Sequence, residues 1–246
     1  MNTILRIIAF CTFICLTACG GGGGGGSSTT SQTTNADATG VWTGTFTQNG
    51  AGTAQLTGII ANNQLRFLSI DAGALYEGVI SVNGNKFTSS TTNYEIGGTI
   101  FSSGTQSGTV NPGKTLSGTF QNSDGSSGTF SLTYDPITSR GASLATISAN
   151  WTITVGSDSL TLSIDTNGTI TGSDTSGCVY NGSVTISNTG VNIYTLAISI
   201  ASCSDSTING AYTGYAVVTD NTTTNDTLIY EVSNPNYLFA GTLNRS

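Results

Sequence analysis

Polar and apolar residues alternate with a period of two from Gly40 onward, and this pattern constrains the fold more than any other feature of the sequence. Trp42, Gly44 and Phe46 fall on one side of an extended chain, and the threonines between them fall on the other. Turn-forming residues interrupt the alternation about every eight to twelve residues, as they do between short antiparallel strands. The pattern therefore predicts an all-β chain whose strands bury one face and expose threonine, serine or asparagine on the other.

The strand pattern begins twice. Trp42 lies in the first strand of one half, and Trp151 lies in a similar segment, residues 149–155, that opens the other half. Each half holds about eight segments of strand character, which indicates a weak internal duplication. We expect two tandem antiparallel eight-stranded up-and-down β-barrels, residues 40–136 and 149–246, because barrel closure removes exposed strand edges. Two β-sandwiches are the alternative, since periodicity alone does not separate the two architectures.

A short linker, residues 137–148, separates the two predicted barrels. Pro136 ends the preceding strand, because proline restricts the backbone and cannot donate to a strand ladder. The segment that follows has room for one helical turn.

The first eighteen residues have the features of a signal peptide. Arg6 precedes an apolar run over residues 7–16, which is too short to cross a bilayer as a permanent helix. The run ends in Leu16-Thr17-Ala18-Cys19. This motif resembles the lipobox of bacterial lipoproteins. The resemblance implies cleavage before Cys19, diacylglycerol on the Cys19 thiol and a further amide-linked acyl chain such as palmitate, and several acyl chains anchor a protein permanently.

Residues 19–39 are expected to form the lipidated cysteine and a flexible tether. Residues 20–26 are all glycine, and serine and threonine dominate the stretch that follows. Gly20 stands where an aspartate would signal retention at the inner membrane in enteric bacteria. The resemblance therefore implies an outer-membrane anchor, with the body on the periplasmic side or at the cell surface.

The composition excludes several classes of partner. After removal of residues 1–18, five basic and thirteen acidic residues remain, a net charge of −8, and the chain has no histidine. No cluster of lysine and arginine is present to neutralise phosphates, so we expect neither nucleic-acid binding nor binding of anionic lipid headgroups. The expected contact with a membrane is the lipid on Cys19.

Two cysteines remain for the fold. Cys11 and Cys15 leave with the signal peptide and Cys19 carries lipid, which leaves Cys178 and Cys203. Both lie in segments of strand character, and an even pair in an oxidising compartment predicts one disulfide bond. Two thiolates without histidine do not complete a tetrahedral site, so we predict neither a metal nor a cofactor.

The order of these features resembles two-domain lipoproteins of proteobacteria. The shared order is a lipobox, a glycine-rich tether, a Gly-x-Trp-x-Gly strand, the linker after Tyr134-Asp135-Pro136, and a second Trp-Thr strand. This resemblance covers most of the mature chain and implies no particular activity. The segment Gly40-Val41-Trp42-Thr43-Gly44 is also similar to the first strand of lipocalin, avidin and related small barrels. The barrel halves of transferrin-binding lipoproteins are a looser parallel, and these resemblances imply an architecture without transferring ligand-binding residues.

The sequence offers few residues for catalysis. Without histidine there is neither a Ser-His-Asp nor a Cys-His arrangement, so we predict that the protein is not an enzyme. Glu77 and Glu95 are the most enzyme-like pair, but alternation places both on outer strand faces, where we expect solvated carboxylates. The aspartates lie beside glycine, asparagine or serine, as turn residues do, and Asp165 begins only an incomplete calcium-loop pattern.

Aromatic residues supply the candidate binding site. Trp42 and Trp151 are each a candidate for the floor of a barrel pocket in which a small apolar ligand stacks. The alternative is that each indole fills the closed end of its barrel. In the last strands, Tyr230, Tyr237 and Phe239 alternate with polar or small residues, so we expect them to face the core instead of forming an exposed partner surface.

Two functional hypotheses follow. In the first, the protein is a monomeric, membrane-anchored envelope lipoprotein with a non-catalytic binding or scaffolding role toward a protein, a glycan or a small apolar molecule. In the second, it is a purely structural envelope lipoprotein with filled barrels and no ligand. An enzymatic function is a distant third hypothesis.

Overall fold

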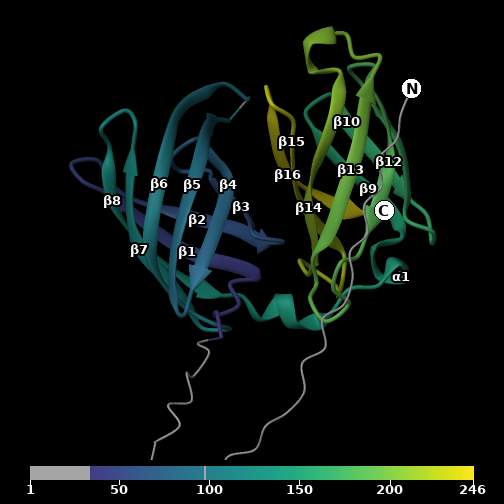
Figure 1. Cartoon of the computed structure of the whole chain (residues 1–246). Helices are drawn as coiled ribbons and strands as arrows, with labels where there is room; N and C mark the ends of the chain where they lie inside the picture. The colour runs from purple at the N-terminus through teal and green to yellow at the C-terminus, as the bar shows by residue number, and fades with distance from the viewer. Residues whose placement is uncertain (1–33, 97) are drawn as a thin grey trace, which may run out of the picture. The chain divides into compact units, whose positions relative to one another are not determined.

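A computed structural model describes residues 34–96 and 98–246 of the chain. The predicted signal peptide, Cys19 and most of the predicted tether lie outside these residues. The described chain folds into two closed antiparallel barrels of eight strands each, drawn from purple to teal and from teal-green to yellow in Figure 1. No helix in the described ranges is long and apolar enough to cross a membrane.

The strands follow one another around each barrel in chain order. The first barrel consists of β1 (Gly40–Gln48), β2 (Gly52–Ala61), β3 (Gln64–Ser69), β4 (Ala74–Asn83), β5 (Lys86–Glu95), β6 (Ile100–Asn111), β7 (Thr115–Asn122) and β8 (Ser127–Tyr134). The second barrel consists of β9 (Ala149–Val155), β10 (Asp158–Ile164), β11 (Thr169–Asp174), β12 (Val179–Thr185), β13 (Tyr194–Ala201), β14 (Gly210–Thr219), β15 (Thr227–Ser233) and β16 (Leu238–Arg245).

Each barrel closes by pairing its first strand with its last. In the first barrel, β1 pairs with β8 over seven residue pairs, from Trp42 opposite Tyr134 to Gln48 opposite Gly128. In the second barrel, the seam between β9 and β16 has two pairs, Asn244 with Thr152 and Arg245 with Trp151. Closure confirms the barrel prediction and excludes the sandwich alternative, in which the edge strands of two separate sheets would stay unpaired.

The two barrels share a local feature that supports an internal duplication. The Trp42 indole N–H donates a hydrogen bond to the carbonyl of Ala38 at 2.9 Å, and the Trp151 indole N–H donates to the carbonyl of Ile147 at 2.8 Å. In both barrels the acceptor lies four residues before the tryptophan, and both rings are fully buried. Each tryptophan therefore fixes the segment that leads into its barrel.

The segment between the barrels is ordered and carries two short helices, the 3₁₀ helix η1 (Pro136–Arg140) and α1 (Leu144–Ile147). Thr138 of η1 is fully buried and bonds to both barrels. Its hydroxyl accepts from the backbone N–H of Val41 at 2.9 Å, and its carbonyl accepts from the backbone N–H of Asn192 at 2.8 Å. These bonds tie the linker to the first and second barrels at once.

Apolar side chains also join the outer faces of the barrels. Val41 and Ile59 of the first barrel pack with Tyr215 and Val217 of the second in a buried cluster. The Tyr215 hydroxyl donates to the carbonyl of Ala61 at 3.1 Å. Because Trp42, Ile60, Ala216 and Val218 belong to the barrel interiors, these stretches of β1, β2 and β14 are buried on both faces.

Candidate functional site

The interior of the first barrel contains a small cavity with a mainly apolar wall. Its volume is about 80 Å³. The wall comes from aromatic and aliphatic side chains that point inward from most strands of the barrel. These side chains include Phe46, Leu56, Phe67, Tyr76, Phe87 and Phe120. Burial raises the pKa of Tyr76 to about 12, with a smaller contribution from Asp124, so its phenol stays neutral at physiological pH.

A hydrogen-bonded polar network occupies one side of this interior. The Ser89 hydroxyl donates to Oε1 of Gln106 at 2.6 Å, and Nε2 of Gln106 donates to the Thr91 hydroxyl at 2.9 Å. The Thr91 hydroxyl donates to Oδ1 of Asn93 at 2.8 Å, and Nδ2 of Asn93 donates to the Ser102 hydroxyl at 2.8 Å. Ser89, Thr91 and Gln106 line the cavity. The cavity is therefore amphipathic, with an apolar body and a polar edge from β5 and β6.

As predicted, β5 buries one face and exposes threonine and serine on the other, but its buried face is largely polar as well. Ser89, Thr91 and Asn93 are buried, and they lie on the same strand face as Phe87. The sequence carries a signal for this arrangement, since positions 87, 89, 91 and 93 share one face by simple alternation. The aromatic ring at position 87 thus identifies an inward face whose other members are polar.

The structure places both candidate pocket-floor residues in the cores of their barrels, and neither is among the residues that line the two cavities. Trp42 packs edge-to-face on Tyr134, with ring centroids 5.4 Å apart. Trp151 lies under the guanidinium of Arg245, 4.6 Å from its ring centroid. The cavity walls are made by other side chains. The role of the two indoles as pocket floors stays a prediction, whereas their packing role is visible in these contacts.

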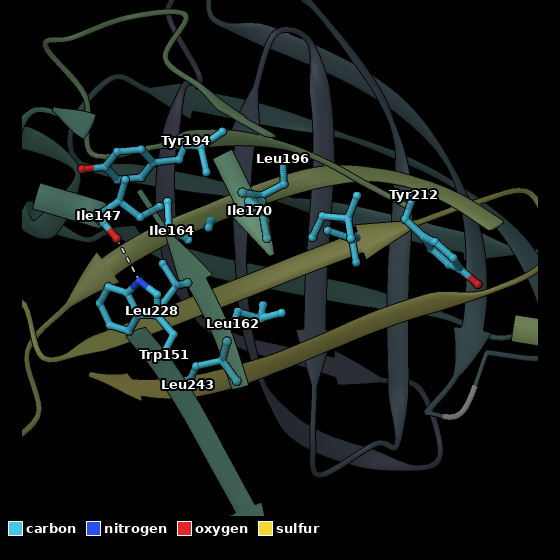
Figure 2. Close-up of a cluster of buried hydrophobic side chains, with 14 of the residues drawn as sticks. Ile147, Trp151, Leu162, Ile164, Ile170, Tyr194, Leu196, Tyr212, Leu228 and Leu243 are labelled. Atoms are coloured by element: carbon cyan, nitrogen blue, oxygen red, sulfur yellow. Dashed lines mark hydrogen bonds between the residues drawn. The ribbon is translucent and has the colours of Figure 1, made fainter. Parts of the chain in front are cut away.

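The interior of the second barrel is more apolar and holds a larger cavity of about 160 Å³. Figure 2 shows Leu162, Ile170 and Leu196 lying between Trp151 and Tyr212, which are toward opposite ends of the cluster. As predicted, Tyr230, Tyr237 and Phe239 pack against this core. The two barrels therefore share an architecture but differ in the chemistry of their interiors.

A charged cluster lies where the outer faces of the two barrels meet. Arg66 of β3 is buried, and its Nη2 donates to Glu77 of β4 at 2.6 Å. Its Nη1 donates to the Ser233 hydroxyl of β15 at 2.8 Å, and its guanidinium lies 5.8 Å from the ring centroid of Tyr215. Glu77 is thus on an outer face as expected, but it is mostly covered and ion-paired, so the prediction of a solvated carboxylate is wrong for it. Glu95 is exposed, as expected.

Glu231 of β15 is the unusual member of this cluster. Its side chain is buried, and no hydrogen bond to its Oε1 is formed within residues 34–96 and 98–246. Burial raises the pKa of Glu231 to about 8; Arg66 opposes the shift and Glu77 adds to it. One guanidinium thus faces two carboxyl groups, and a proton on Glu231 makes the cluster neutral.

Most of the aspartates serve turns, as predicted, although Asp220 also pairs with the guanidinium of Arg140. Asp165 accepts hydrogen bonds from the backbone N–H groups of Asn167 and Thr169, both at 2.8 Å. The Asp226 carboxylate accepts from the backbone of residues 221–223, which lowers its pKa strongly. In the described part of the chain, no group of three or more acidic, cysteine or histidine side chains is placed to hold a metal ion.

The predicted disulfide between Cys178 and Cys203 is present. Cys178 directly precedes β12 and Cys203 follows β13, so the cysteines flank two paired strands and do not lie within them. Val179 and Ala201 face each other next to the bond. The disulfide therefore holds the end of this strand pair opposite its connecting loop.

Replacing both cysteines by alanine is expected to lower the free energy of unfolding by about 3 kcal/mol, because the bond closes a loop of 25 residues in the unfolded chain. Urea unfolding of oxidised protein, reduced protein and the Cys178→Ala/Cys203→Ala variant measures this loss. The reduced protein and the variant should agree; an unchanged midpoint in both would contradict a stabilising role.

Comparisons of the chain with protein families, with curated proteins and with solved structures find no match. The likeness to lipocalin is one of architecture alone: both barrels have the eight antiparallel strands that the resemblance implies.

Proposed function

We propose that this protein is a membrane-anchored envelope lipoprotein with a non-catalytic binding role, and that the first barrel binds a short, neutral molecule with an apolar body and one polar end. The observation that carries the proposal is the amphipathic cavity bordered by Ser89, Thr91 and Gln106. Buried polar networks cost stability unless every member is satisfied, and an apolar interior fills a barrel more simply. The second barrel has such an interior, so the network of the first is not a requirement of the fold.

The size of the cavity limits the ligand. A cavity of about 150 Å³ accommodates benzene, so 80 Å³ corresponds by proportion to about three or four non-hydrogen atoms. Among the lining residues no side chain is charged at neutral pH, which favours a neutral ligand. A ligand of four such atoms has an upper limit of about −6 kcal/mol of binding free energy, or a Kd no lower than roughly tens of micromolar.

The binding proposal is tested with 1-propanol and propionamide, followed by backbone NMR of the lipid-free Cys19→Ser protein. We expect saturable shifts in the strands of the first barrel that line the cavity and none in the second barrel. Thr91→Val removes a hydroxyl from the polar edge and should weaken binding several-fold. Thr119→Val, the same substitution at an exposed position of β7, should not. An absence of saturable shifts in the wild type would favour the alternative of a purely structural lipoprotein with filled barrels.

The anchor is proposed from the motif Leu16-Thr17-Ala18-Cys19 and the glycine-rich stretch after it. Lipid on Cys19 would place the barrels at the outer membrane on a flexible tether. Growth of cells with labelled palmitate should mark the protein, and Cys19→Ser should remove the label. A variant that still carries label would contradict this part of the proposal without affecting the binding experiment.

A further inference from the structure

We propose that the interior of the second barrel binds one neutral, monocyclic aromatic molecule that carries a hydrogen-bond acceptor, and that the Tyr230 hydroxyl donates to this acceptor. The site is separate from the cavity of the first barrel and takes a different class of ligand. The two proposals can therefore fail independently.

The size of the second cavity matches a single aromatic ring. Its volume is about 160 Å³, and a cavity of about 150 Å³ accommodates benzene. A two-ring molecule would not fit without expansion of the barrel. Inward-facing side chains that belong to the barrel core form the wall, among them Leu162, Ile170, Leu196, Ile198 and Phe239.

The chemistry of the wall favours a neutral ligand. Among the residues that line the cavity, none carries an acidic or basic side chain. Asp174, whose carboxylate accepts a hydrogen bond from the Tyr180 hydroxyl at 2.6 Å, is not among the lining residues. A charged ligand would lose its hydration without gaining a counter-charge.

Tyr230 differs from Tyr180, the other tyrosine that lines the cavity. The hydroxyls of Tyr180, Tyr194 and Tyr212 donate to Asp174, to the carbonyl of Ser143 and to the carbonyl of Ile208, respectively. For Tyr230, no hydroxyl hydrogen bond forms with any residue in the part of the chain that the structure describes. Tyr230 is partly buried and lines the cavity, so its unpartnered hydroxyl is a donor available to a ligand.

The phenol of Tyr230 packs over a glycine of the paired strand. The residue lies opposite Gly241 of β16, and a Cβ at Gly241 would come within 3.1 Å of the Tyr230 hydroxyl. Because glycine has no side chain, the phenol ring of Tyr230 has room to lie at this position. Burial raises the pKa of Tyr230, so the hydroxyl remains protonated and acts as a donor toward an acceptor on the ligand.

The test compares benzene with pyridine, two rings of the same size of which only pyridine has an acceptor. At pH 8 pyridine is neutral. Binding to the lipid-free Cys19→Ser protein is followed by methyl NMR of Leu162 and Ile170, which line the cavity. We expect saturable binding of both rings to the wild type. Tyr230→Phe, which keeps the ring and the packing, should weaken pyridine binding about three- to tenfold and leave benzene within about twofold.

Two further variants make the result specific. Tyr180→Phe is the matched control, because its hydroxyl already has a partner, and it should leave the ratio of pyridine to benzene affinity unchanged. Ile198→Phe should fill the cavity and abolish binding of both rings, while the NMR signals of the first barrel stay unchanged. The proposal is overturned if neither ring binds to the wild type, or if Tyr230→Phe changes both affinities equally. If Ile198→Phe does not fold, the comparison of pyridine and benzene binding in Tyr230→Phe still decides the proposal.

Discussion

The free energy of unfolding is expected to fall as the pH rises from about 4.5 to about 8, and Glu231→Gln is expected to remove most of this dependence. The pKa of the Glu231 carboxyl is raised from 4.5 to about 8 in the folded protein. Across this window the unfolded chain releases the proton while the folded chain retains it, so the folded state loses relative stability as the pH rises. The total loss is on the order of 5 kcal/mol, and stability levels off above pH 8.

The surroundings of Glu231 explain why glutamine should substitute well. Arg66 already donates to Glu77 and Ser233, so it does not supply a full counter-charge for a second carboxylate. Glutamine has the shape of the protonated acid and no charge to bury. At pH 5 the variant and the wild type should therefore have similar stability, whereas at pH 8.5 the variant should be more stable.

Urea unfolding at pH 5, 6.5 and 8.5 tests this prediction, with Glu95→Gln at an exposed site of the first barrel as the matched control. The control should keep the wild-type pH dependence. Two aspartates give the free energy of unfolding a second pH dependence, which has the opposite sign and lies in a lower pH range. The pKa of Asp165 and Asp174 is lowered by hydrogen bonds, so their contribution is lost only as the pH falls through those lowered values. A Glu231→Gln variant with an unchanged slope between pH 5 and 8 would show that another group controls stability there.

The sequence predicts the barrels well because their interiors obey alternation. Phe46 points inward with Leu132 from the pairing strand β8, and each has serine or threonine neighbours that point outward. Strand closure follows from the count of strands and from the cost of unpaired edges. The two tryptophan segments indicate the duplication in the sequence. In the structure, each indole donates the same kind of hydrogen bond to the carbonyl four residues before it.

The contact between the barrels is harder to predict, because it depends on which outer faces meet. A partial signal exists where alternation stops. Residues 59–61 and 215–218 are apolar at successive positions, which is typical of strands buried on both faces. Nothing local distinguishes Arg66, Glu77 and Glu231 from solvated charges, since their burial depends on a surface supplied by the other barrel.

The candidate sites were only partly predictable for a similar reason. The choice of Trp42 and Trp151 as pocket residues rests on ring size, but a cavity is the space that side chains leave unfilled. The cavity walls are formed by residues that no sequence motif distinguishes, such as Thr91 and Tyr230. Which residues meet there depends on the register of several strands at once. Inward polar residues on β5 were nevertheless visible in the alternation from Phe87.

Trp151→Ala is expected to lower the free energy of unfolding by about 3–5 kcal/mol, and to loosen the second barrel at its seam first. The indole is fully buried and holds Ile147 of α1 through its N–H. It also packs under Arg245, whose backbone forms one of the two residue pairs that join β9 to β16. Removing the ring therefore leaves a cavity. It also removes packing contacts from the pairing of β9 with β16, which has only two residue pairs.

Hydrogen exchange followed by mass spectrometry distinguishes this local effect from a general loss of stability. In Trp151→Ala, amides of β9 and β16 should lose protection before those of β1 and β8. The latter two strands close the first barrel through seven residue pairs. Trp42→Ala is the matched control, because it removes an equally buried indole with an equivalent hydrogen bond from the other barrel. Equal loss of protection in both barrels of the Trp151 variant would mean that the contacts around Arg66 and Tyr215 make the two barrels unfold as one cooperative unit.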